Sequence, residues 1–470
     1  MGSGRHSSEL TFLIRKMKKR IKLYRKLGVR MEKEVNIIGG GLAGCEAAYQ
    51  IAKQGIKVKL WEMKPNRFSP AHSNQNLAEV VCSNSFKSNL ITNACGLLKE
   101  ELRLLDSNLI KIADQVAVPA GQALAVDREK FAEEVTKSME QNSKIEIIRK
   151  EVGKDISLKE LIERGVVVVA TGPLTSDSLT NQIQEITGME ELHFFDAAAP
   201  IVEKDSIDFR IAFWGDRYGK GDSSYLNLPM NQEEYETFWQ ELVHAEVVNL
   251  HEFEKREIFE GCMPIEVMAK RGIDTLRFGP LKPVGFTDPR TGKRPYAIVQ
   301  LRQDNQEGNL FNLVGFQTNL KYGEQKRVFQ MIPGMQEAEF VKYGVMHRNT
   351  YLNSPKLLDS TYCFRTIPSL YFAGQITGVE GYVESIASGL VVGKNVIAKI
   401  KEKEPVVFPE ETMIGTLAQY IATEREDFQP MNANFGILPS LEEFVKDKKQ
   451  RYEKLSERAL QKIRQNMTKK

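Results

Sequence analysis

The spacing of apolar and polar positions predicts an α/β protein built on a parallel sheet. Short apolar runs rich in β-branched residues are typical of buried parallel strands, and they occur at residues 35–38, 56–61, 144–149, 165–170 and 370–372. Amphipathic stretches between these runs predict helices over residues 45–54 and 97–112, from about residue 127 and from about residue 383. The repeated order of strand, helix and strand favours a Rossmann-like domain.

The first predicted strand leads directly into a glycine turn. Gly39, Gly41 and Gly44 have the spacing G-x-G-x-x-G, and Glu62 ends the next predicted strand about twenty residues later. Gly39 allows a tight turn, Gly41 lets the backbone approach a pyrophosphate, and Gly44 lets the helix pack closely on the strand. The helix N-terminus would face the phosphates, and Glu62 would accept hydrogen bonds from a ribose. This pattern predicts a dinucleotide site but does not distinguish FAD from NAD.

Two later segments favour FAD, which is the longer ligand. The valine run at residues 165–170 is followed by Gly172, and the strand at residues 370–372 is followed by a glycine-rich loop and a helix. A helix N-terminus behind glycines can hold the anionic edge of a reduced flavin ring. The residues expected to bind the cofactor are Gly39, Gly41, Leu42, Ala43, Gly44, Glu62, Gly172, Gly374, Gly378, Gly381, Tyr382 and Glu384.

The middle of the chain changes character and predicts an inserted α+β domain. Predicted helices at residues 233–244 and 252–259 mix there with predicted strands at 296–302 and 310–317. The expected division is a basic leader (1–30), a first FAD-binding part (31–208), the inserted domain (209–346), a second FAD-binding part (347–440) and a charged C-terminal helix (441–470).

The inserted domain interleaves cations with aromatic residues, which suits a nucleic-acid surface. A mixed solvated surface is the alternative reading of the same pattern. The candidate RNA-binding residues are Lys270, Arg271, Arg277 and Lys282. Residues 1–30 hold ten Lys or Arg against one Glu, while the whole chain carries only +3, so the remainder is net negative. RNA binding by the remainder would therefore need local basic patches.

Composition excludes several classes of protein. Of the 470 residues, 41% are hydrophobic and 27% are charged, which is ordinary for a globular protein. No apolar run approaches the length of a membrane span, and no secretory signal is visible. The five cysteines are scattered without a C-x-x-C pair, which argues against a disulfide framework or a metal site and for the cytoplasm. The leader could contact RNA or lipid, or be a solvated extension.

Several long stretches resemble one family, the folate- and FAD-dependent RNA uracil-5-methyltransferases of bacteria. The resemblance runs from residue 35 to about residue 439. The matching stretches are GGGLAGCEAA, PAHSNQNLAEVVCSNSF, TNACGLLKEEL, VDREKF, ATGPLTS, FEGCMPIEVMAKRG, GPLKPVG, VGFQTNLKYGEQKRVFQMIPG, VMHRNTYLN and GVEGYVESIASG.

The resemblance implies a mechanism and a role for four residues. Cys262 would be the nucleophile that adds to carbon 6 of uracil and makes carbon 5 reactive. Cys82 would be the second active-site thiol, either a general base or a protector of the flavin adduct. His347 would stack on the folate pterin, with a structural histidine as the alternative, and Tyr382 would lie beside both flavin and folate. Methylenetetrahydrofolate would donate the carbon, and NADH or NADPH would reduce the flavin.

The expected activity is methylation of carbon 5 of a uridine in RNA, most simply at position 54 of tRNA. Departures from the family pattern at residues 86–89 and at Gln122 leave a uridine of 23S rRNA as an alternative target. Two further readings are a flavin oxidoreductase acting on a small substrate and a non-catalytic RNA-binding flavoprotein. The two cysteines in separate domains and the basic inserted domain argue against the first, and the presence of both Cys82 and Cys262 argues against the second. No membrane and no obligatory protein partner are expected, and the general base is not identified.

Overall fold

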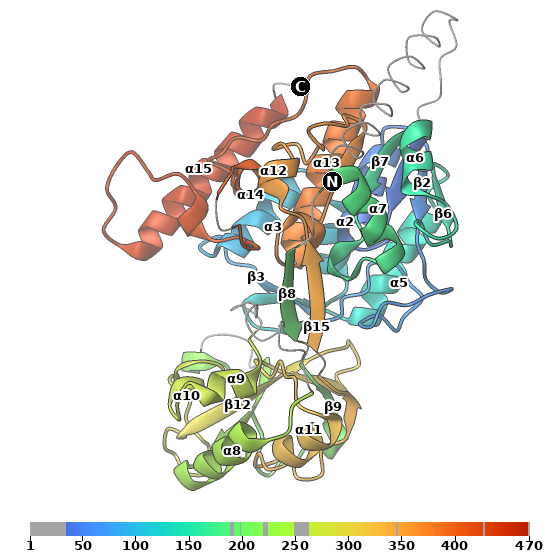
Figure 1. The fold of residues 1–470 in the computed structure, drawn as a ribbon. Helices are drawn as coiled ribbons and strands as arrows, with labels where there is room; N and C mark the ends of the chain where they lie inside the picture. Colours follow the sequence, from blue (N-terminus) through green and yellow to red (C-terminus); the bar gives the residue numbers. More distant parts are fainter. Residues whose placement is uncertain are drawn as a thin grey trace, which may run out of the picture.

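Two modules lie end to end in the computed structural model (Figure 1). The structure describes residues 34–188, 192–197, 199–219, 224–248, 263–344, 346–425 and 428–468. An antiparallel ribbon of β8 (Leu192–Ala197) and β15 (Met346–Tyr351) joins the first module, which contains both ends of the described chain, to the second module, residues 199–344. Within these ranges, no helix has the length and apolar character needed to cross a bilayer.

The first module is organised around a parallel five-stranded sheet, as the apolar runs predicted. Its order is β16-β7-β1-β2-β6, and every neighbouring pair is parallel. The strands are β1 (Glu34–Ile38), β2 (Val58–Trp61), β6 (Ile145–Ile148), β7 (Gly165–Val169) and β16 (Leu370–Phe372). The chain therefore returns from the second module to add β16 beside β7, which confirms the expected Rossmann-like domain with an insertion.

Helices cover both faces of this sheet. The central helices α2 (Leu42–Ala52) and α13 (Tyr382–Ile400) cross so closely that a Cβ on Gly389 would lie 2.3 Å from the carbonyl oxygen of Ala43. Further helices of the module are α5 (Arg128–Glu140), α6 (Leu158–Arg164), α7 (Asp177–Thr187), α12 (Ser354–Leu357) and α14 (Met413–Ala422). Asp127 caps α5 by accepting a hydrogen bond from the Lys130 N–H at 3.0 Å, at the position where a helix start was predicted.

The single helix predicted over residues 97–112 is wrong. The structure has α3 (Ala94–Leu104) and α4 (Asn108–Gln115), separated at Asp106, whose φ is 61°. Ser107 then caps α4 through its hydroxyl, which accepts from the Ile110 N–H. The apolar spacing continues through the break because both helices bury their apolar faces in the same core, so periodicity alone did not reveal it.

The second module is a six-stranded antiparallel sheet with helices packed on it, which confirms the α+β prediction. Its order is β10-β11-β12-β13-β9-β14. The strands are β9 (Ile201–Glu203), β10 (Phe213–Trp214), β11 (Tyr225–Met230), β12 (Ala297–Gln303), β13 (Leu310–Leu313) and β14 (Phe340–Lys342). The helices are α8 (Gln232–His244), α9 (Ile265–Lys270), α10 (Thr275–Phe278) and α11 (Tyr322–Phe329).

Two observations concern the bounds expected from the sequence. The strand β9 lies before residue 209 and pairs with β13 and β14 in the sheet of the second module, while the division of the chain into domains stays a prediction. The C-terminal helix α15 (Lys448–Thr468) begins later than the expected residue 441, and its apolar face, including Leu455 and Ile463, is buried in the core of the first module. The helix predicted at residues 252–259 lies outside the described residues.

A small sheet of the first module supports the segment that carries Cys82. It has the order β3-β5-β4, with β3 (Ser85–Ser88), β4 (Ala117–Val118) and β5 (Ala123–Val126). Residues 80–84, here called the Cys82 loop, lead into β3. This loop lies where the first module meets the second, because its side chains bond to strand β12 as described below.

Candidate functional site

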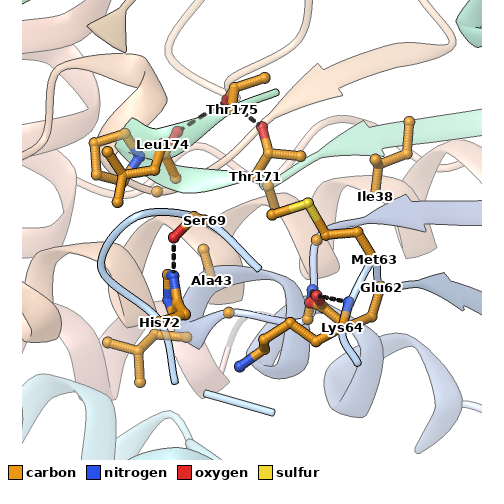
Figure 2. Close-up of a pocket in the computed structure, with 18 of the residues that line it drawn as sticks. Ile38, Ala43, Glu62, Met63, Lys64, Ser69, His72, Thr171, Leu174 and Thr175 are labelled. Atoms are coloured by element: carbon orange, nitrogen blue, oxygen red, sulfur yellow. Dashed lines mark hydrogen bonds between the residues drawn. The ribbon is translucent and has the colours of Figure 1, made fainter. Parts of the chain in front are cut away.

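A cavity opens at the carboxyl ends of the parallel strands of the first module. The cavity is open to solvent on one side and is lined by the turns that follow β1, β2, β7 and β16. This edge of an open α/β sheet is where ligands bind in such folds. Figure 2 shows Glu62, Lys64 and His72 on one side of the cavity and Thr171, Leu174 and Thr175 on the other. The predicted cofactor residues on its wall are Gly39, Gly41, Leu42, Ala43, Glu62, Gly172, Gly374 and Tyr382.

The three glycines of the first turn have different surroundings. Gly39 has a φ of 102°, and a Cβ there would lie 2.5 Å from the carbonyl oxygen of Ala170. A Cβ on Gly44 would lie 1.9 Å from the carbonyl oxygen of Gly39, so this residue permits close packing of helix α2 on the turn. A Cβ on Gly41 would meet nothing within 4 Å. Gly41 therefore faces open space at the N-terminus of α2, where a pyrophosphate is favoured by free N–H groups and the helix dipole.

Glu62 closes the same turn with its carboxylate. The Gly40 N–H donates to its Oε2 at 2.8 Å, and the Lys64 N–H donates to its Oε1 at 2.9 Å. The side chain is buried at 7% exposure and lines the cavity. These bonds fix the carboxylate at the end of β2, where the remaining lone pairs of its oxygens are available to a ribose.

His72 and Lys64 belong to the cavity, although sequence reasoning did not single them out. The ring Nδ1 of His72 is hydrogen-bonded to the Ser69 hydroxyl at 2.5 Å (Figure 2). Burial, and then the charge of Lys64, hold the pKa of His72 below its usual value, so the ring is neutral near neutral pH. The Lys64 ammonium donates to the carbonyl oxygen of Asn76 at 2.6 Å and pairs with Glu79 at 3.3 Å. His72 lies within the quoted stretch PAHSNQNLAEVVCSNSF, which was the available signal for it, whereas Lys64 lies before that stretch.

The opposite wall comes from the turns after β7 and β16. Gly172 has a φ of 67°, and a Cβ there would meet nothing within 4 Å, so this turn also borders open space. Gly374, with a φ of 82°, donates its N–H to the Ser388 hydroxyl at 2.7 Å, which ties the turn to helix α13. The residues of both turns thus line the cavity with backbone and hydroxyl groups.

Four of the predicted cofactor residues are not on the cavity wall. One is Gly44, which packs helix α2 on the glycine turn and whose contact with a cofactor stays a prediction. The other three belong to the loop before α13 and to the start of that helix. A Cβ on Gly378 would lie 2.5 Å from the ring of Phe428, and one on Gly381 would lie 2.1 Å from Glu384 Oε2. Glu384 itself is 1% exposed and accepts a hydrogen bond from the Ala433 N–H at 2.9 Å. These contacts shape the loop before α13, and cofactor contact by these three residues stays a prediction.

Tyr382 connects the cavity to the Cys82 loop. Its hydroxyl oxygen accepts hydrogen bonds from the N–H groups of Cys82 at 2.9 Å and Ser83 at 3.1 Å. Burial raises the pKa of this hydroxyl, so it stays protonated. Tyr382 lines the cavity, and Cys82, which is half-buried, is therefore joined to the cavity wall through its backbone.

Two arginines hold the Cys82 loop from opposite sides. Arg128, from helix α5, donates to the carbonyl oxygens of Val80 and Val81 at 2.9 and 3.1 Å. It also pairs with Asp304 of the second module at 3.0 Å. The loop is thereby attached both to the first module and to the chain that follows strand β12.

Arg302, on β12, makes the complementary contacts at the other end of the loop. It donates to the Ser83 hydroxyl at 2.7 Å and to Asn84 Oδ1 at 2.9 Å. Its side chain is buried at 7% exposure, and burial lowers its pKa. Arg128 thus holds the loop backbone before Cys82 and Arg302 holds two side chains after it, so groups from both modules position the loop.

The remaining predicted site residues are only partly placed. Cys262 lies outside the described residues, and so does the side chain of His347, whose backbone pairs with Asp196 in the β8–β15 ribbon. Lys270, Arg271 and Lys282 are exposed on the second module. Arg277 is partly buried, with its guanidinium 3.6 Å from the ring centroid of Tyr296. The RNA-binding assignment of these cations stays a prediction.

The cavity residues fit FAD. Gly41 and Gly172 leave open space where a phosphate chain needs it, helix α2 directs its N-terminus there, and the buried Glu62 lies at the end of β2. Tyr382 and Val81 line the same cavity, and the Tyr382 hydroxyl joins it to the backbone of the Cys82 loop.

Comparison with known proteins is consistent with this arrangement. Residues 34–404 match the family described as Glucose inhibited division protein A. The "Methylenetetrahydrofolate--tRNA-(uracil-5-)-methyltransferase TrmFO" of Acetivibrio thermocellus is 58% identical over 436 residues, which is 93% of this chain and 99% of that protein. The protein of the same name from Natranaerobius thermophilus is 59% identical over 427 residues, covering 91% and 97% of the two chains. In fold, the chain is similar to Aquifex aeolicus GidA, with a TM-score of 0.65 at 18% identity, covering 93% of this chain and 74% of that one.

Proposed function

The chain belongs to the family of methylenetetrahydrofolate–tRNA-(uracil-5-)-methyltransferases, and we propose that it methylates carbon 5 of a uridine in tRNA with FAD as cofactor. The observation that carries the proposal is the identity of 58% across 99% of a relative of that name. It is supported by the cavity, whose glycine turn and Glu62 fit FAD and whose wall includes Tyr382, which bonds to the backbone N–H of Cys82. The flavin, when bound, supplies the transfer of the one-carbon unit and the reducing electrons.

In this proposal, the protein's own residues bind the cofactor and hold the Cys82 loop in place. The N-terminus of α2, behind Gly41, holds the phosphates, and Glu62 holds the ribose. Tyr382 keeps the Cys82 N–H and the Ser83 N–H directed at one oxygen, and Arg128 and Arg302 fix the loop on either side. We assign Cys82 a proton-transfer or protective role next to the cofactor, because its thiol is half-buried at this position.

The nucleophile in this proposal is Cys262, which lies outside the described residues and is assigned from its sequence context alone. A thiolate that adds to carbon 6 of uracil forms a sulfur–carbon bond and raises the electron density at carbon 5. After the carbon unit is transferred, a base removes the carbon 5 proton and the sulfur–carbon bond breaks. His347 would contact the folate, position 54 would be the target uridine, and NADH or NADPH would be the final reductant.

The test incubates the purified protein with methylenetetrahydrofolate, NADH and either unmodified tRNA or a 23S rRNA transcript. We expect mass spectrometry to detect 5-methyluridine in the tRNA, and its absence from both RNAs would overturn the proposal. The Cys262→Ala variant is expected to keep its FAD absorbance and to lose methylation. A variant that loses the flavin as well would show that Cys262 has a structural role.

A further inference from the structure

An exposed tyrosine of the second module adopts a strained backbone conformation. Tyr218 has a φ of 64°, in the left-handed region that a bulky residue rarely adopts. Its side chain is nevertheless 63% exposed, so burial of the ring does not compensate for this conformation. Strained residues of this kind tend to occur at ligand contacts, where the surrounding structure holds them in place.

The neighbouring turn holds Tyr218 firmly. The Tyr218 N–H donates to the carbonyl oxygen of Gly285 at 2.7 Å. Arg217 donates to the carbonyl oxygens of Lys282 and Val284 at 3.1 and 2.9 Å, and its guanidinium lies 5.0 Å from the ring centroid of Phe286. The tyrosine ring lies against Gly285, because a Cβ there would be 3.1 Å from two of its carbons. The ring is therefore fixed in place while most of its surface faces solvent.

Tyr218 stands near the rim of the junction that carries Cys82. Two residues before it, Asp216 lies against Gly121 of the first module, and the Tyr225 hydroxyl donates to the carbonyl oxygen of Ala120 at 3.3 Å. Tyr225 pairs directly with Arg302 across β11 and β12. Arg302 in turn bonds to Ser83, the neighbour of Cys82. A short series of contacts thus links the Tyr218 turn to the Cys82 loop.

We propose that Tyr218 is a stacking platform for an unpaired base of the RNA substrate, next to the target uridine. This inference rests on the proposed function, since a uridine inside folded tRNA must leave its stack for an enzyme to act on its carbon 5. Such extrusion leaves neighbouring bases without partners, and aromatic side chains stabilise unstacked bases without requiring a particular sequence. The cation of Lys282, exposed on the same turn, is placed to contact the backbone phosphates.

The experiment measures the affinity for unmodified tRNA by filter binding and the KM and kcat of methylation for four variants. Tyr218→Ala is expected to weaken tRNA binding about tenfold, and Tyr218→Phe to retain it, because stacking needs only the ring. Tyr218→Asn is expected to weaken binding while leaving Tm unchanged or higher, since Asn tolerates this backbone conformation. The control is Tyr322→Ala, because Tyr322 is 57% exposed at the start of α11, on the opposite flank from α9 and α10 (Figure 1).

The outcomes separate this inference from the function on which it rests. If the wild type methylates tRNA and Tyr218→Ala binds tRNA as the wild type does, the platform is refuted and the function stands. If Tyr218→Asn lowers Tm and FAD content together with binding, Tyr218 is a structural residue and the inference also fails. If the wild type methylates neither RNA, the proposed function fails, while the binding measurements still report on the platform.

Discussion

Two glycines in one turn are required for different reasons, and this difference is testable at the scale of single residues. Gly41→Ala places its methyl group in open space, so we expect Tm of the FAD-free protein to be unchanged and FAD affinity to fall at least tenfold, because the phosphates need that space. Gly44→Ala forces its methyl group to 1.9 Å from the Gly39 carbonyl oxygen, so we expect the fold itself to lose several kcal/mol of stability.

The measurement is flavin absorbance after purification together with Tm of protein stripped of FAD. Gly55→Ala serves as the control. Gly55 also borders open space, but it is not among the residues that line the cavity. Its φ of 77° predicts a modest loss of Tm with FAD content retained. Equal FAD content in Gly41→Ala and the wild type would mean that the phosphates do not pass this residue.

At the scale of single residues, the sequence was a better guide to which residues form a local motif than to which distant residues touch. The spacing of Gly39, Gly41 and Glu62 was sufficient to predict their places on one cavity wall, because the fingerprint is local and strand, helix and strand follow directly. Arg302 could not be predicted in the same way. Its partner Ser83 lies 219 positions earlier, and only the folded junction of two modules brings them together.

At the scale of elements, a buried carboxylate on one helix caps another. Glu101 of α3 is fully buried, and its oxygens accept hydrogen bonds from the Met413 and Ile414 N–H groups at 2.7 and 2.8 Å, at the start of α14. Burial raises the pKa of Glu101 from 4.5 to about 8, although these two N–H groups oppose the rise. The folded state therefore holds this proton more tightly than the unfolded chain does.

The sign of the resulting pH dependence follows from linkage. Because the pKa of Glu101 is raised on folding, its contribution to stability is complete below about pH 4.5 and is lost as the pH rises through about 8. Glu101→Gln cannot titrate, so we expect its free energy of unfolding to fall less steeply across this window than that of the wild type. The variant should also be about 1–3 kcal/mol less stable at the acidic end, because the NH₂ group of the new glutamine would face one of the two backbone N–H donors at the start of α14. That donor would then have no acceptor.

Urea unfolding at several pH values between about 5 and about 8.5 measures both effects. The matched control is Glu100→Gln, one residue away on α3, where the carboxylate pairs with Arg103 and is 35% exposed. That variant is expected to follow the pH profile of the wild type. If the free energy of unfolding changed with pH equally in Glu101→Gln and the wild type, a group other than Glu101 would cause the pH dependence.

Elements with a strong local pattern were predictable, and those defined by distant pairing were not. The strand at Leu370–Phe372 was predicted to the residue, because a buried parallel strand is a continuous apolar run. The ribbon of β8 and β15 was missed, since Leu192–Ala197 and Met346–Tyr351 pair only with each other. The break at Asp106 was also missed, because the helices on both sides bury apolar faces in one core.

At the scale of the whole molecule, a buried ion pair couples the modules where the Cys82 loop lies. Burial alone would lower the pKa of Arg128, but Asp304 beside it raises the pKa above its ordinary value. The two side chains are 13% and 5% exposed, so the pair is shielded from solvent. Arg128 also binds the Val80 and Val81 carbonyl oxygens, so a change at Asp304 reaches the Cys82 loop through one side chain.

We therefore expect Asp304→Asn to destabilise the protein by about 3 kcal/mol, because it leaves a buried guanidinium without its counter-charge. Hydrogen exchange should rise in residues 80–84 and kcat should fall, while FAD content stays near that of the wild type, since the glycine turn is untouched. The control is Asp208→Asn, which removes a pair with Arg210 that is 91% exposed, and it should change none of these quantities. If exchange at residues 80–84 were the same in Asp304→Asn as in the wild type, the second module would not position the thiol. The two modules would then cooperate only through the substrate that they share.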